Sequence, residues 1–307
     1  MSRTGSEGAD LSIVIPAFNE ELGLRATLAN VTEAFPKAEI IVVDDYSKDK
    51  TSAVAQEFPN VSVFRHTFNR GQGASLKTGM LHATNTWVAW FDADNEHRVE
   101  DLARLSQRTQ EDRVVAAIGQ RRASVNITRG VGKYLIRLIG RGLRINAGSD
   151  LNCGLRVFQR EVILRYLPLI PDRFSASLMS TLIMIERGYP IAFEPIETNA
   201  RIGHSTVRLK DGFEAILMLI RAVLLFAPMR FFLPLGLGMV VFGGIYSIVM
   251  ALLVGIGFPV AGMLVITVGV LAIILGLMAD QISQLRLGQL PGTPAVEIVI
   301  DNRQPQT

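Results

Sequence analysis

The sequence predicts an α/β domain with a mostly parallel sheet, followed by a hairpin of two transmembrane helices. In the first part of the chain, short apolar runs alternate with longer helical stretches, a pattern typical of parallel sheets with helices on both faces. Acidic residues follow three of these apolar runs. Near the C-terminus, no charged residue occurs from Phe231 to Ala279. Together these observations divide the chain into an α/β domain with many charged residues and an apolar C-terminal hairpin that would anchor it in a membrane.

The expected strands are runs of Ile, Val and aromatic residues, which suit strands buried on both faces. They cover residues 11–16, 38–43, 61–64, 87–91 and 114–118. Polar turns open a helix after each of the first four strands, and these helices are expected to end near residues 35, 58, 83 and 110. The Gly71-Gln72-Gly73 turn lacks the spacing of a dinucleotide or P-loop fingerprint, so we interpret it only as the start of a helix.

Acidic residues cluster where three of the predicted strands end. Glu20 follows the first strand, Asp44 and Asp45 the second, and Asp92 and Asp94 the fourth. A single acid after a strand usually caps the next helix. The carboxyl ends of parallel strands share one edge of the sheet, however, and ligands of open α/β sheets bind there. Three acidic positions at one edge therefore favour a site for a nucleotide and a metal ion.

Asp92 and Asp94 are the main candidates for metal ligands, because they stand one residue apart after the apolar run 87–91. Their hard oxygen atoms suit a divalent cation that also keeps water molecules and substrate phosphates. Taken alone, the pair is equally compatible with an Asp-rich turn before a helix. The other acids predicted at the same edge favour the metal.

Composition excludes several classes of protein. The 307 residues carry 31 basic and 28 acidic side chains, a net charge of +3, and no aromatic-basic motif of a nucleic-acid-binding protein is present. The single cysteine, Cys153, excludes an intramolecular disulfide and a paired-cysteine metal site. The first ten residues are polar and include acids, unlike a signal peptide.

The uncharged C-terminal tract predicts two membrane spans. Residues 255–259 interrupt it with glycine and proline, leaving spans near 231–254 and 260–280. Each is close to the roughly 20 residues that cross the hydrocarbon core of a bilayer. A buried hairpin in a soluble core is the alternative, but soluble helices seldom run so long without a polar face.

Flanking charges predict the orientation of this hairpin. Arg221 and Arg230 precede the first span, Arg286 follows the second, and the connecting turn carries no basic residue. Positive residues favour the cytoplasmic side of a membrane. We therefore expect an integral membrane protein with both termini and the α/β domain in the cytoplasm.

Several segments resemble a known family. Ile15–Glu20, Val42–Ser47 and Asp92–Asp94 resemble the three sequence blocks of GT-A family 2 glycosyltransferases, and Asp150–Phe158 resembles the acceptor-side block of that family. With the paired C-terminal spans, the chain looks like the polyisoprenyl-phosphate glycosyltransferases, the group of dolichol-phosphate mannose synthase and GtrB. The resemblance implies a GT-A fold, a Rossmann-like α/β domain.

The resemblance also implies roles for individual residues. It places Asp92 and Asp94 on Mg²⁺ or Mn²⁺ at the donor diphosphate, with Glu96 near the metal, and Arg121 near a substrate phosphate as a catalytic residue. The nucleotide-sugar site would consist of Pro16, Phe18, Glu20, Asp44, Asp45 and Ala93.

A lipid-phosphate site is expected in the second half of the chain. Residues 201–206 resemble the family's Arg-x-Gly-x-Ser-Lys block, but Thr206 stands where the family commonly has lysine, so Arg208 or Lys210 is expected to replace that contact. Residues 128–145 predict a helix with a basic stripe, either a solvated surface helix or an interfacial helix facing lipid headgroups. The lipid-phosphate candidates are Arg121, Arg129, Lys133, Arg201, His204, Ser205 and Arg208.

The chain is accordingly expected to be a membrane-bound, inverting glycosyltransferase. It would move a sugar from a UDP- or GDP-linked donor to undecaprenyl or dolichyl phosphate at the cytoplasmic face. The alternatives are transfer to a lipid hydroxyl, or a non-catalytic scaffold that binds nucleotide sugar. Glycine-rich spans leave a homo-oligomer possible. The expected units are a catalytic domain over residues 1–206, an amphipathic helix over 207–230, the spans within 231–282 and a tail over 283–307.

Overall fold

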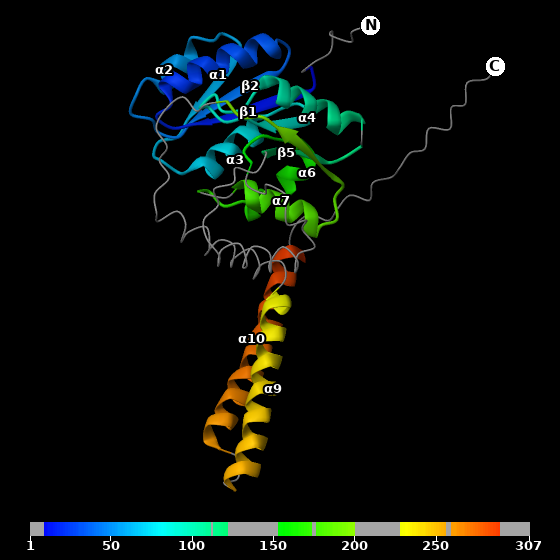
Figure 1. Ribbon diagram of the computed structural model, residues 1–307. Helices are drawn as coiled ribbons and strands as arrows, with labels where there is room; N and C mark the ends of the chain where they lie inside the picture. The colour runs from blue at the N-terminus through cyan, green and yellow to red at the C-terminus, as the bar shows by residue number, and fades with distance from the viewer. Residues whose placement is uncertain are drawn as a thin grey trace, which may run out of the picture.

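The computed structural model contains an α/β domain and a hairpin of two long helices that projects from it (Figure 1). The structure describes residues 9–111, 113–121, 153–173, 176–199, 228–255 and 259–288. This architecture confirms the predicted fold class, an α/β domain with a mostly parallel sheet followed by an apolar helical hairpin.

The strands are short and mostly buried. They are β1 (Leu11–Ala17), β2 (Glu39–Asp44), β3 (Val61–Arg65), β4 (Trp87–Trp90), β5 (Ala116–Arg121), β6 (Arg156–Gln159) and β7 (Ile191–Ile196). The helices of the domain are α1 (Glu21–Ala34), α2 (Thr51–Gln56), α3 (Gln72–His82), α4 (Val99–Glu111), α6 (Arg160–Arg165) and α7 (Ala176–Glu186), with a 3-10 turn η1 (Leu167–Leu169). The hairpin consists of α9 (Pro228–Val254) and α10 (Val260–Gly288).

The strands form one sheet in the order β3-β2-β1-β4-β6-β5-β7. All neighbouring pairs are parallel except those of β6, which runs antiparallel to both β4 and β5. The sequence predicted β1 to β5 but neither β6 nor β7, and β6 separates β4 from β5. The segment Cys153–Phe158 therefore enters the centre of the sheet, next to the strand that carries Asp92.

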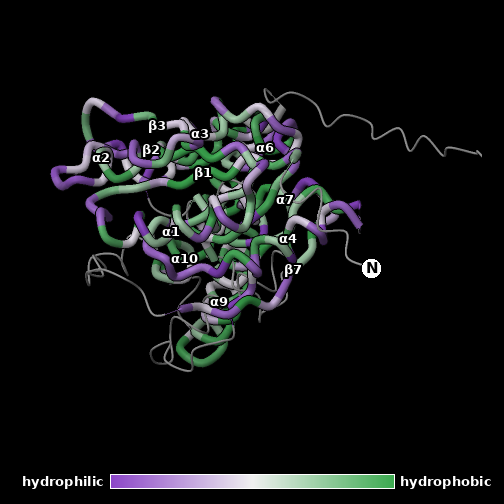
Figure 2. Tube along the Cα trace, turned by 90° about the horizontal axis from the view of Figure 1, so that it is seen from above, coloured by the Kyte–Doolittle hydropathy of each residue, from purple (hydrophilic) through white to green (hydrophobic). Residues whose placement is uncertain are grey.

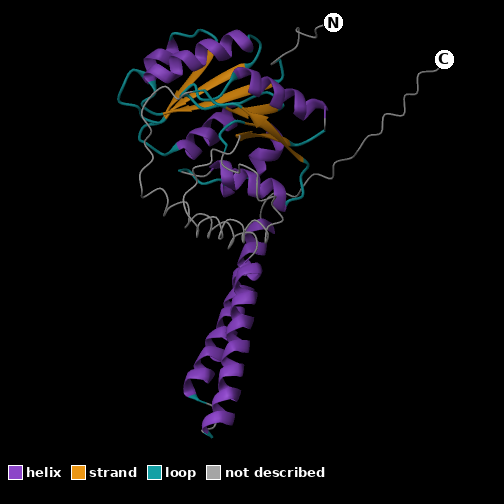
Figure 3. Ribbon diagram, in the orientation of Figure 1, coloured by secondary structure: helices purple, strands orange, loops and turns teal. Residues whose placement is uncertain are grey.

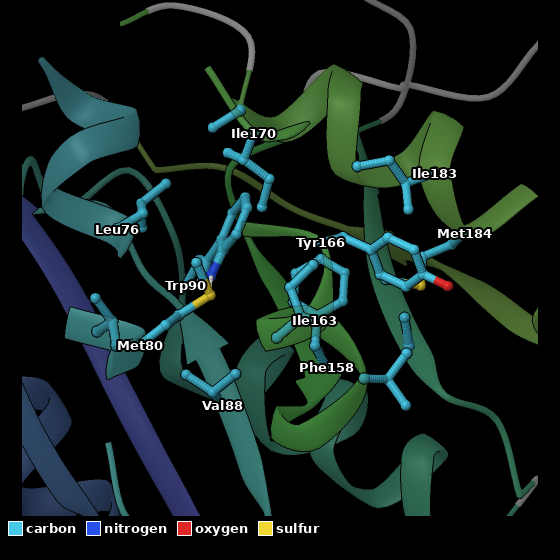
Figure 4. Packing of buried hydrophobic residues seen from close by; sticks show 14 of the residues in the cluster. Leu76, Met80, Val88, Trp90, Phe158, Ile163, Tyr166, Ile170, Ile183 and Met184 are labelled. Atoms are coloured by element: carbon cyan, nitrogen blue, oxygen red, sulfur yellow. Dashed lines mark hydrogen bonds between the residues drawn. The ribbon is translucent and has the colours of Figure 1, made fainter. Parts of the chain in front are cut away.

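Helices cover both faces of the sheet (Figure 3), so each strand contributes side chains to two cores. In β1, Ile13 and Ile15 belong to the core beneath α1 and α4, whereas Val14 belongs to the core beneath α3, α6 and α7, as the twofold alternation of a strand requires. Figure 4 shows the second core around Trp90, whose indole Nε1 lies 3.3 Å from the Met80 sulfur and whose ring centroid lies 5.1 Å from that of Phe158.

The helices α9 and α10 are each long and apolar enough to cross a bilayer, over Pro228–Val254 and Val260–Leu285. Most of their large side chains are exposed, and Figure 2 shows hydrophobic colouring along α9 as well as along the buried strand β1. The first span begins slightly before the expected residue 231, and α10 continues to Gly288, past the expected boundary at residue 282. Of the expected juxtamembrane helix, residues 207–227 lie outside the described part of the chain.

Small residues form the seam between the two helices. A Cβ on Gly236 would lie 2.6 Å from the Gly269 carbonyl oxygen, and a Cβ on Gly243 would lie 3.0 Å from that of Gly262. Within each helix these glycines are spaced for repeated close approach, as in small-residue packing of membrane helices. Gly238 and Gly244 have open space around them among the described residues. On α9 the glycines thus divide into two that pack against α10, Gly236 and Gly243, and two with open space, Gly238 and Gly244.

This packing makes a cross-linking prediction at Ser247, which is fully buried in the seam opposite Gly262. A Cβ on Gly262 would lie 3.2 Å from the Ser247 Cβ, close to the separation found in disulfides. The variant with Ser247→Cys and Gly262→Cys is expected to form a disulfide with copper phenanthroline, measured by loss of two alkylatable thiols in mass spectrometry. Val249→Cys with Gly262→Cys is the matched control, because Val249 is 43% exposed. Equal oxidation of both pairs would contradict the packing.

Candidate active site

The predicted acids lie in three turns at the carboxyl ends of β1, β2 and β4, and each turn contains a non-glycine residue in the left-handed region. These are Asn19 (φ 54°), Tyr46 (φ 66°) and Asn95 (φ 59°). Asparagine adopts this conformation readily, whereas for tyrosine it is uncommon and is kept where the surrounding structure enforces it, often at functional sites. Local preference therefore favours the turns at Asn19 and Asn95, and the surrounding structure must hold the turn at Tyr46.

The first two turns are joined by hydrogen bonds from backbone to side chain. The Asn19 and Glu20 amides donate to Ser47 Oγ and Thr51 Oγ1, both at 2.9 Å. In return, the Lys48 amide donates to Asn19 Oδ1 at 2.8 Å. These bonds fix the position of Glu20 relative to the turn that carries Asp45.

Asp44 and Asp45 differ in role although they are neighbours. The Asp44 side chain is fully buried, accepts a 2.8 Å hydrogen bond from the Ser47 amide and another from Ser52 Oγ, and lies 3.4 Å from Arg65 Nε. These hydrogen bonds stabilise the turn, and the Asp44 carboxylate does not line the cavity described below. Asp44, which the sequence placed in the nucleotide-sugar site, is thus set apart from the other acids by its position.

Asp45 does reach the cavity, and its carboxylate anchors a second loop. It accepts hydrogen bonds from the Arg70 amide at 2.8 Å, the Gly71 amide at 2.7 Å and His66 Nδ1 at 2.7 Å. The other ring nitrogen of His66 lies 2.9 Å from Thr78 Oγ1 on α3. Asp45 therefore ties the end of β2 to the loop that opens α3.

Asp92 is held from two sides. Gln72 Nε2 donates to its Oδ1 at 3.2 Å, and His97 Nε2 lies 3.0 Å from its Oδ2. Burial disfavours the imidazolium, but the hydrogen bond to Asp92 and the nearby charges of Asp92, Glu96 and Asp94 together raise the pKa of His97 above its ordinary value. Asp94 accepts the Glu96 amide at 3.1 Å. The metal candidates are thus oriented before any substrate binds.

These residues surround a cavity of about 450 Å³. Five carboxylates and one guanidinium are among the lining side chains, which come from Pro16, Ala17, Phe18, Glu20, Asp45, Asn69, Gly71, Gln72, Ser75, Asp92, Ala93, Asp94, Glu96 and Arg173. Among the sequence-predicted donor-site and metal residues, only Asp44 is missing from this lining. The structure therefore brings into one cavity lining the acids named by the sheet-edge argument, Glu20, Asp45, Asp92 and Asp94, and the residues implied by the family resemblance, Pro16, Phe18, Ala93 and Glu96.

Asp92 and Asp94 offer the donor set that a hard divalent cation prefers, carboxylate oxygens on one cavity wall. In the described residues, however, no three His, Cys, Asp or Glu side chains approach closely enough to form a complete metal site. Glu96 instead points its Oε1 to within 3.7 Å of Arg121 Nη1. The geometry fits a cation held by two carboxylates, with substrate oxygens and water as its remaining ligands.

The expected lipid-phosphate residues are described only in part. Arg121 ends β5 beside Glu96 and lies outside the cavity lining. The others lie outside the described residues, namely Arg129, Lys133, Arg201, His204, Ser205 and Arg208, as does the predicted helix 128–145. Residues 198 and 199, the last described ones before the 201–206 block, lie against the turn that follows β4. The Asn199 amide donates to the Glu96 carbonyl at 2.9 Å, and Thr198 forms a β-bridge with His97.

Sequence reasoning missed six lining residues, namely Ala17, Asn69, Gly71, Gln72, Ser75 and Arg173. The two glycines of the 71–73 turn were a usable signal, because both approach the backbone of residues 171–173 too closely for a side chain. Nothing in the spacing of Arg173 indicated its place, since it reaches the cavity from a distant loop.

Comparison with known proteins identifies the family. The sequence profile described as glycosyl transferase family 2 matches residues 12–166, about half of the chain. The chain belongs to this family. A second profile, described as the GtrB C-terminal hairpin, matches residues 227–285 of this glycosyltransferase, the region of α9 and α10.

Curated relatives point in the same direction. The glycosyltransferase is 30% identical over 176 residues to a dolichyl-phosphate beta-glucosyltransferase of Trichomonas vaginalis, covering 49% of this chain and 53% of that protein. It is 32% identical over 163 residues to an undecaprenyl-phosphate 4-deoxy-4-formamido-L-arabinose transferase of Sodalis glossinidius, covering 50% of each. The chain thus spans about half the length of these relatives.

A solved structure confirms the fold. Glucosyl-3-phosphoglycerate synthase of Mycobacterium tuberculosis, crystallised with Mn²⁺, UDP and glucosyl-3-phosphoglycerate, superposes with a TM-score of 0.58 at 19% identity. The match covers 71% of this chain and 79% of that one. At this identity the likeness establishes the GT-A-like architecture of the glycosyltransferase.

Proposed function

We propose that this glycosyltransferase moves a sugar from a nucleoside diphosphate sugar to a polyprenyl phosphate at the cytoplasmic face of a membrane. The observation that carries the proposal is the presence, in one chain, of a carboxylate-lined cavity and a hairpin matching the GtrB profile. The dolichyl-phosphate and undecaprenyl-phosphate relatives supply the class of acceptor.

The proposed donor site uses the cavity walls described above. Pro16 near the end of β1, Phe18 and Glu20 in the turn after it, and Asp45 in the turn after β2 all line the cavity, and the family resemblance assigns them to the base and ribose of the donor. Asp92 and Asp94 would hold Mg²⁺ or Mn²⁺, which when bound would supply positive charge to offset the negative charge of the departing nucleoside diphosphate. His97 and Gln72 keep the Asp92 carboxylate turned toward the diphosphate.

The acceptor explains why a catalytic base is not required. A lipid phosphate oxygen is already anionic at neutral pH, so it attacks the anomeric carbon directly, on the face opposite the leaving diphosphate, with inversion. The site instead needs positively charged, correctly oriented side chains that bring the two anionic substrates together. Arg121, with its Nη1 beside Glu96, is a candidate for such a contact.

The proposed topology follows from charge and length. Arg230 lies in the first turn of α9, at the end of the hairpin nearer the domain, and the opposite end carries the short connection between the helices (Figure 1). Positive residues favour the cytoplasmic side. The domain therefore faces the cytoplasm, and the connection near residue 255 lies on the other side.

The test is sugar transfer by the purified protein. It would receive undecaprenyl or dolichyl phosphate, a panel of UDP- and GDP-sugars, and Mg²⁺ or Mn²⁺. We expect a chloroform-extractable glycolipid with at least one donor, and loss of the product with a chelator or with Asp94→Asn, because the cation then loses a charged ligand. Glu33→Gln, which removes an exposed carboxylate from α1, is the matched control and should keep full activity.

Nucleotide binding without transfer to either lipid phosphate would contradict the proposal. A product formed only with a lipid alcohol would move the reaction to a hydroxyl acceptor. Binding without turnover on any acceptor would favour a scaffold.

A further inference from the structure

The charges that line the cavity are unbalanced. Glu20, Asp45, Asp92, Asp94 and Glu96 contribute carboxylates, whereas Arg173 contributes the one cationic side chain of the lining among the described residues. Both substrates of the proposed reaction are phosphate anions, so they would meet strong repulsion from this surface. A divalent cation offsets only part of that charge. A fixed positive group in the same lining would offset more.

The backbone of Arg173 is fixed against the start of α3. The Gly73 amide donates to the Arg173 carbonyl at 3.3 Å, and the Ala74 amide donates to the Asp172 carbonyl at 2.8 Å. Lys77 of α3 adds an ion pair to Asp172 at 2.6 Å. Two carbonyl groups thus satisfy amides that an isolated helix start leaves without partners.

The glycine turn makes this contact possible. A Cβ on Gly73 would lie 2.0 Å from the Pro171 carbonyl oxygen, and a Cβ on Gly71 would lie 2.7 Å from that of Asp172 and 2.9 Å from the Arg173 Cα. No side chain fits at either position. The turn that the sequence suggested only as a helix start therefore serves to seat the loop 171–173 at the rim of the cavity.

The Arg173 side chain is exposed, in contrast to its firmly held backbone. Two other arginines near the site have carboxylate partners, Arg65 with Asp44 and Arg121 with Glu96. Within the part of the chain that the structure describes, Arg173 has no ion pair. A guanidinium presents a planar fork of N–H donors that matches two phosphate oxygens.

We propose that Arg173 binds a phosphate group of one of the two substrates, the donor diphosphate or the acceptor phosphate, and so acts as a binding residue of the reaction. This inference rests on the proposed function for the identity of the substrates. It assigns the loop 171–173 to the active site. The Gly71-Gln72-Gly73 turn then both begins α3 and positions this loop.

The experiment uses the full-length protein in detergent with Arg173→Gln and Arg173→Lys. Arg25→Gln is the matched control, because Arg25 is an exposed arginine on α1 that pairs with Glu57 away from the cavity lining. One arm measures binding of UDP and GDP with MnCl₂ by calorimetry, without lipid. The other measures the KM for undecaprenyl phosphate at saturating donor. Thermal unfolding checks that the variants remain folded.

We expect Arg173→Gln either to lower the nucleotide affinity or to raise the KM for undecaprenyl phosphate, by about ten- to a hundredfold. This is the effect of losing a charged hydrogen-bonding group. Arg173→Lys should recover part of the loss, because it keeps the charge but not the fork. A change confined to nucleotide affinity assigns Arg173 to the donor, and a change confined to the lipid KM assigns it to the acceptor.

Values within about twofold of the wild type in both arms would overturn the inference, since even one charged hydrogen bond is worth more than that. Failure of the proposed function is recognised separately. In that case the wild-type protein transfers no sugar to lipid phosphate. The nucleotide-binding arm then tests Arg173 alone: weaker binding in Arg173→Gln supports the inference, and unchanged binding overturns it.

Discussion

Gly154→Ala is expected to abolish most sugar transfer while leaving the protein folded. A Cβ on Gly154 would lie 2.2 Å from Asp92 Oδ2, 2.9 Å from Asp92 Cγ and 3.1 Å from His97 Nε2. These separations are too short for carbon, so the Asp92 carboxylate must turn away from His97 and from its place in the cavity wall. Because 29% of the Asp92 side chain is exposed, it can move into the cavity without breaking the core.

The expected loss is about a hundredfold or more in kcat/KM, the size of effect seen when an oriented charge-stabilising group is removed from an active site. Mn²⁺ affinity, measured by electron paramagnetic resonance without substrate, should fall in parallel. Gly244→Ala is the matched control, because nothing described lies within 4 Å of a Cβ at that position. Normal Mn²⁺ affinity in Gly154→Ala would show that Asp92 is not displaced or does not bind the metal.

The contact between Gly154 and Asp92 could not be predicted from the sequence. The block from Asp150 to Phe158 resembles the acceptor side of the family, yet Gly154 lies against the carboxylate of Asp92, which follows β4 and is proposed to bind the metal. The sequence could not show this, because β6 is four residues long, contains an arginine and enters the sheet antiparallel. A short strand with a charged residue lacks the apolar run by which β1, β2 and β4 were predicted.

The acids at the sheet edge were predictable because parallel strands place their carboxyl ends together, a rule that needs only the order of the strands. The rule does not distinguish adjacent residues. Asp44 and Asp45 both follow an apolar run, but one is buried in its own turn and the other reaches the cavity. Successive residues at the end of a strand face opposite ways, so the choice depends on the turn that follows.

Contacts across long stretches of sequence were beyond prediction for a different reason. Arg173 lies at the cavity because the glycines at the start of α3, Gly71 and Gly73, leave room for its backbone. Strand β7 joins the sheet although its residues are mostly half-buried and include Pro195. Neither feature leaves a periodic pattern in its own segment. Their positions are set by packing against distant elements.

Arg156→Met is expected to destabilise the domain more than any surface substitution. Arg156 lies in β6 and is fully buried. Its Nε donates to the Cys153 carbonyl at 2.7 Å, and its Nη1 donates to Ser180 Oγ at 3.1 Å and Thr181 Oγ1 at 2.5 Å on α7. Methionine fills similar space but donates no hydrogen bond, so buried acceptors lose their donor.

Leaving such acceptors unsatisfied costs about 3 kcal/mol, because a buried charged donor contributes more than a neutral one. The free energy of unfolding of the purified protein in urea measures this loss. Arg25→Met is the matched control, and little change is expected because that side chain is exposed. An unchanged urea midpoint in Arg156→Met would mean that these hydrogen bonds contribute nothing to stability.

The same substitution connects stability to catalysis. The carbonyl that Arg156 holds belongs to Cys153, the residue before Gly154, so its release loosens the backbone that lies against Asp92. Transfer should therefore fall in Arg156→Met even at a temperature where the protein remains folded. Arg156→Lys retains a charge but cannot donate from Nε and Nη1 together, so it should recover only part of either loss. If folded Arg156→Met transferred sugar at the wild-type rate, the geometry of Gly154 would be independent of β6.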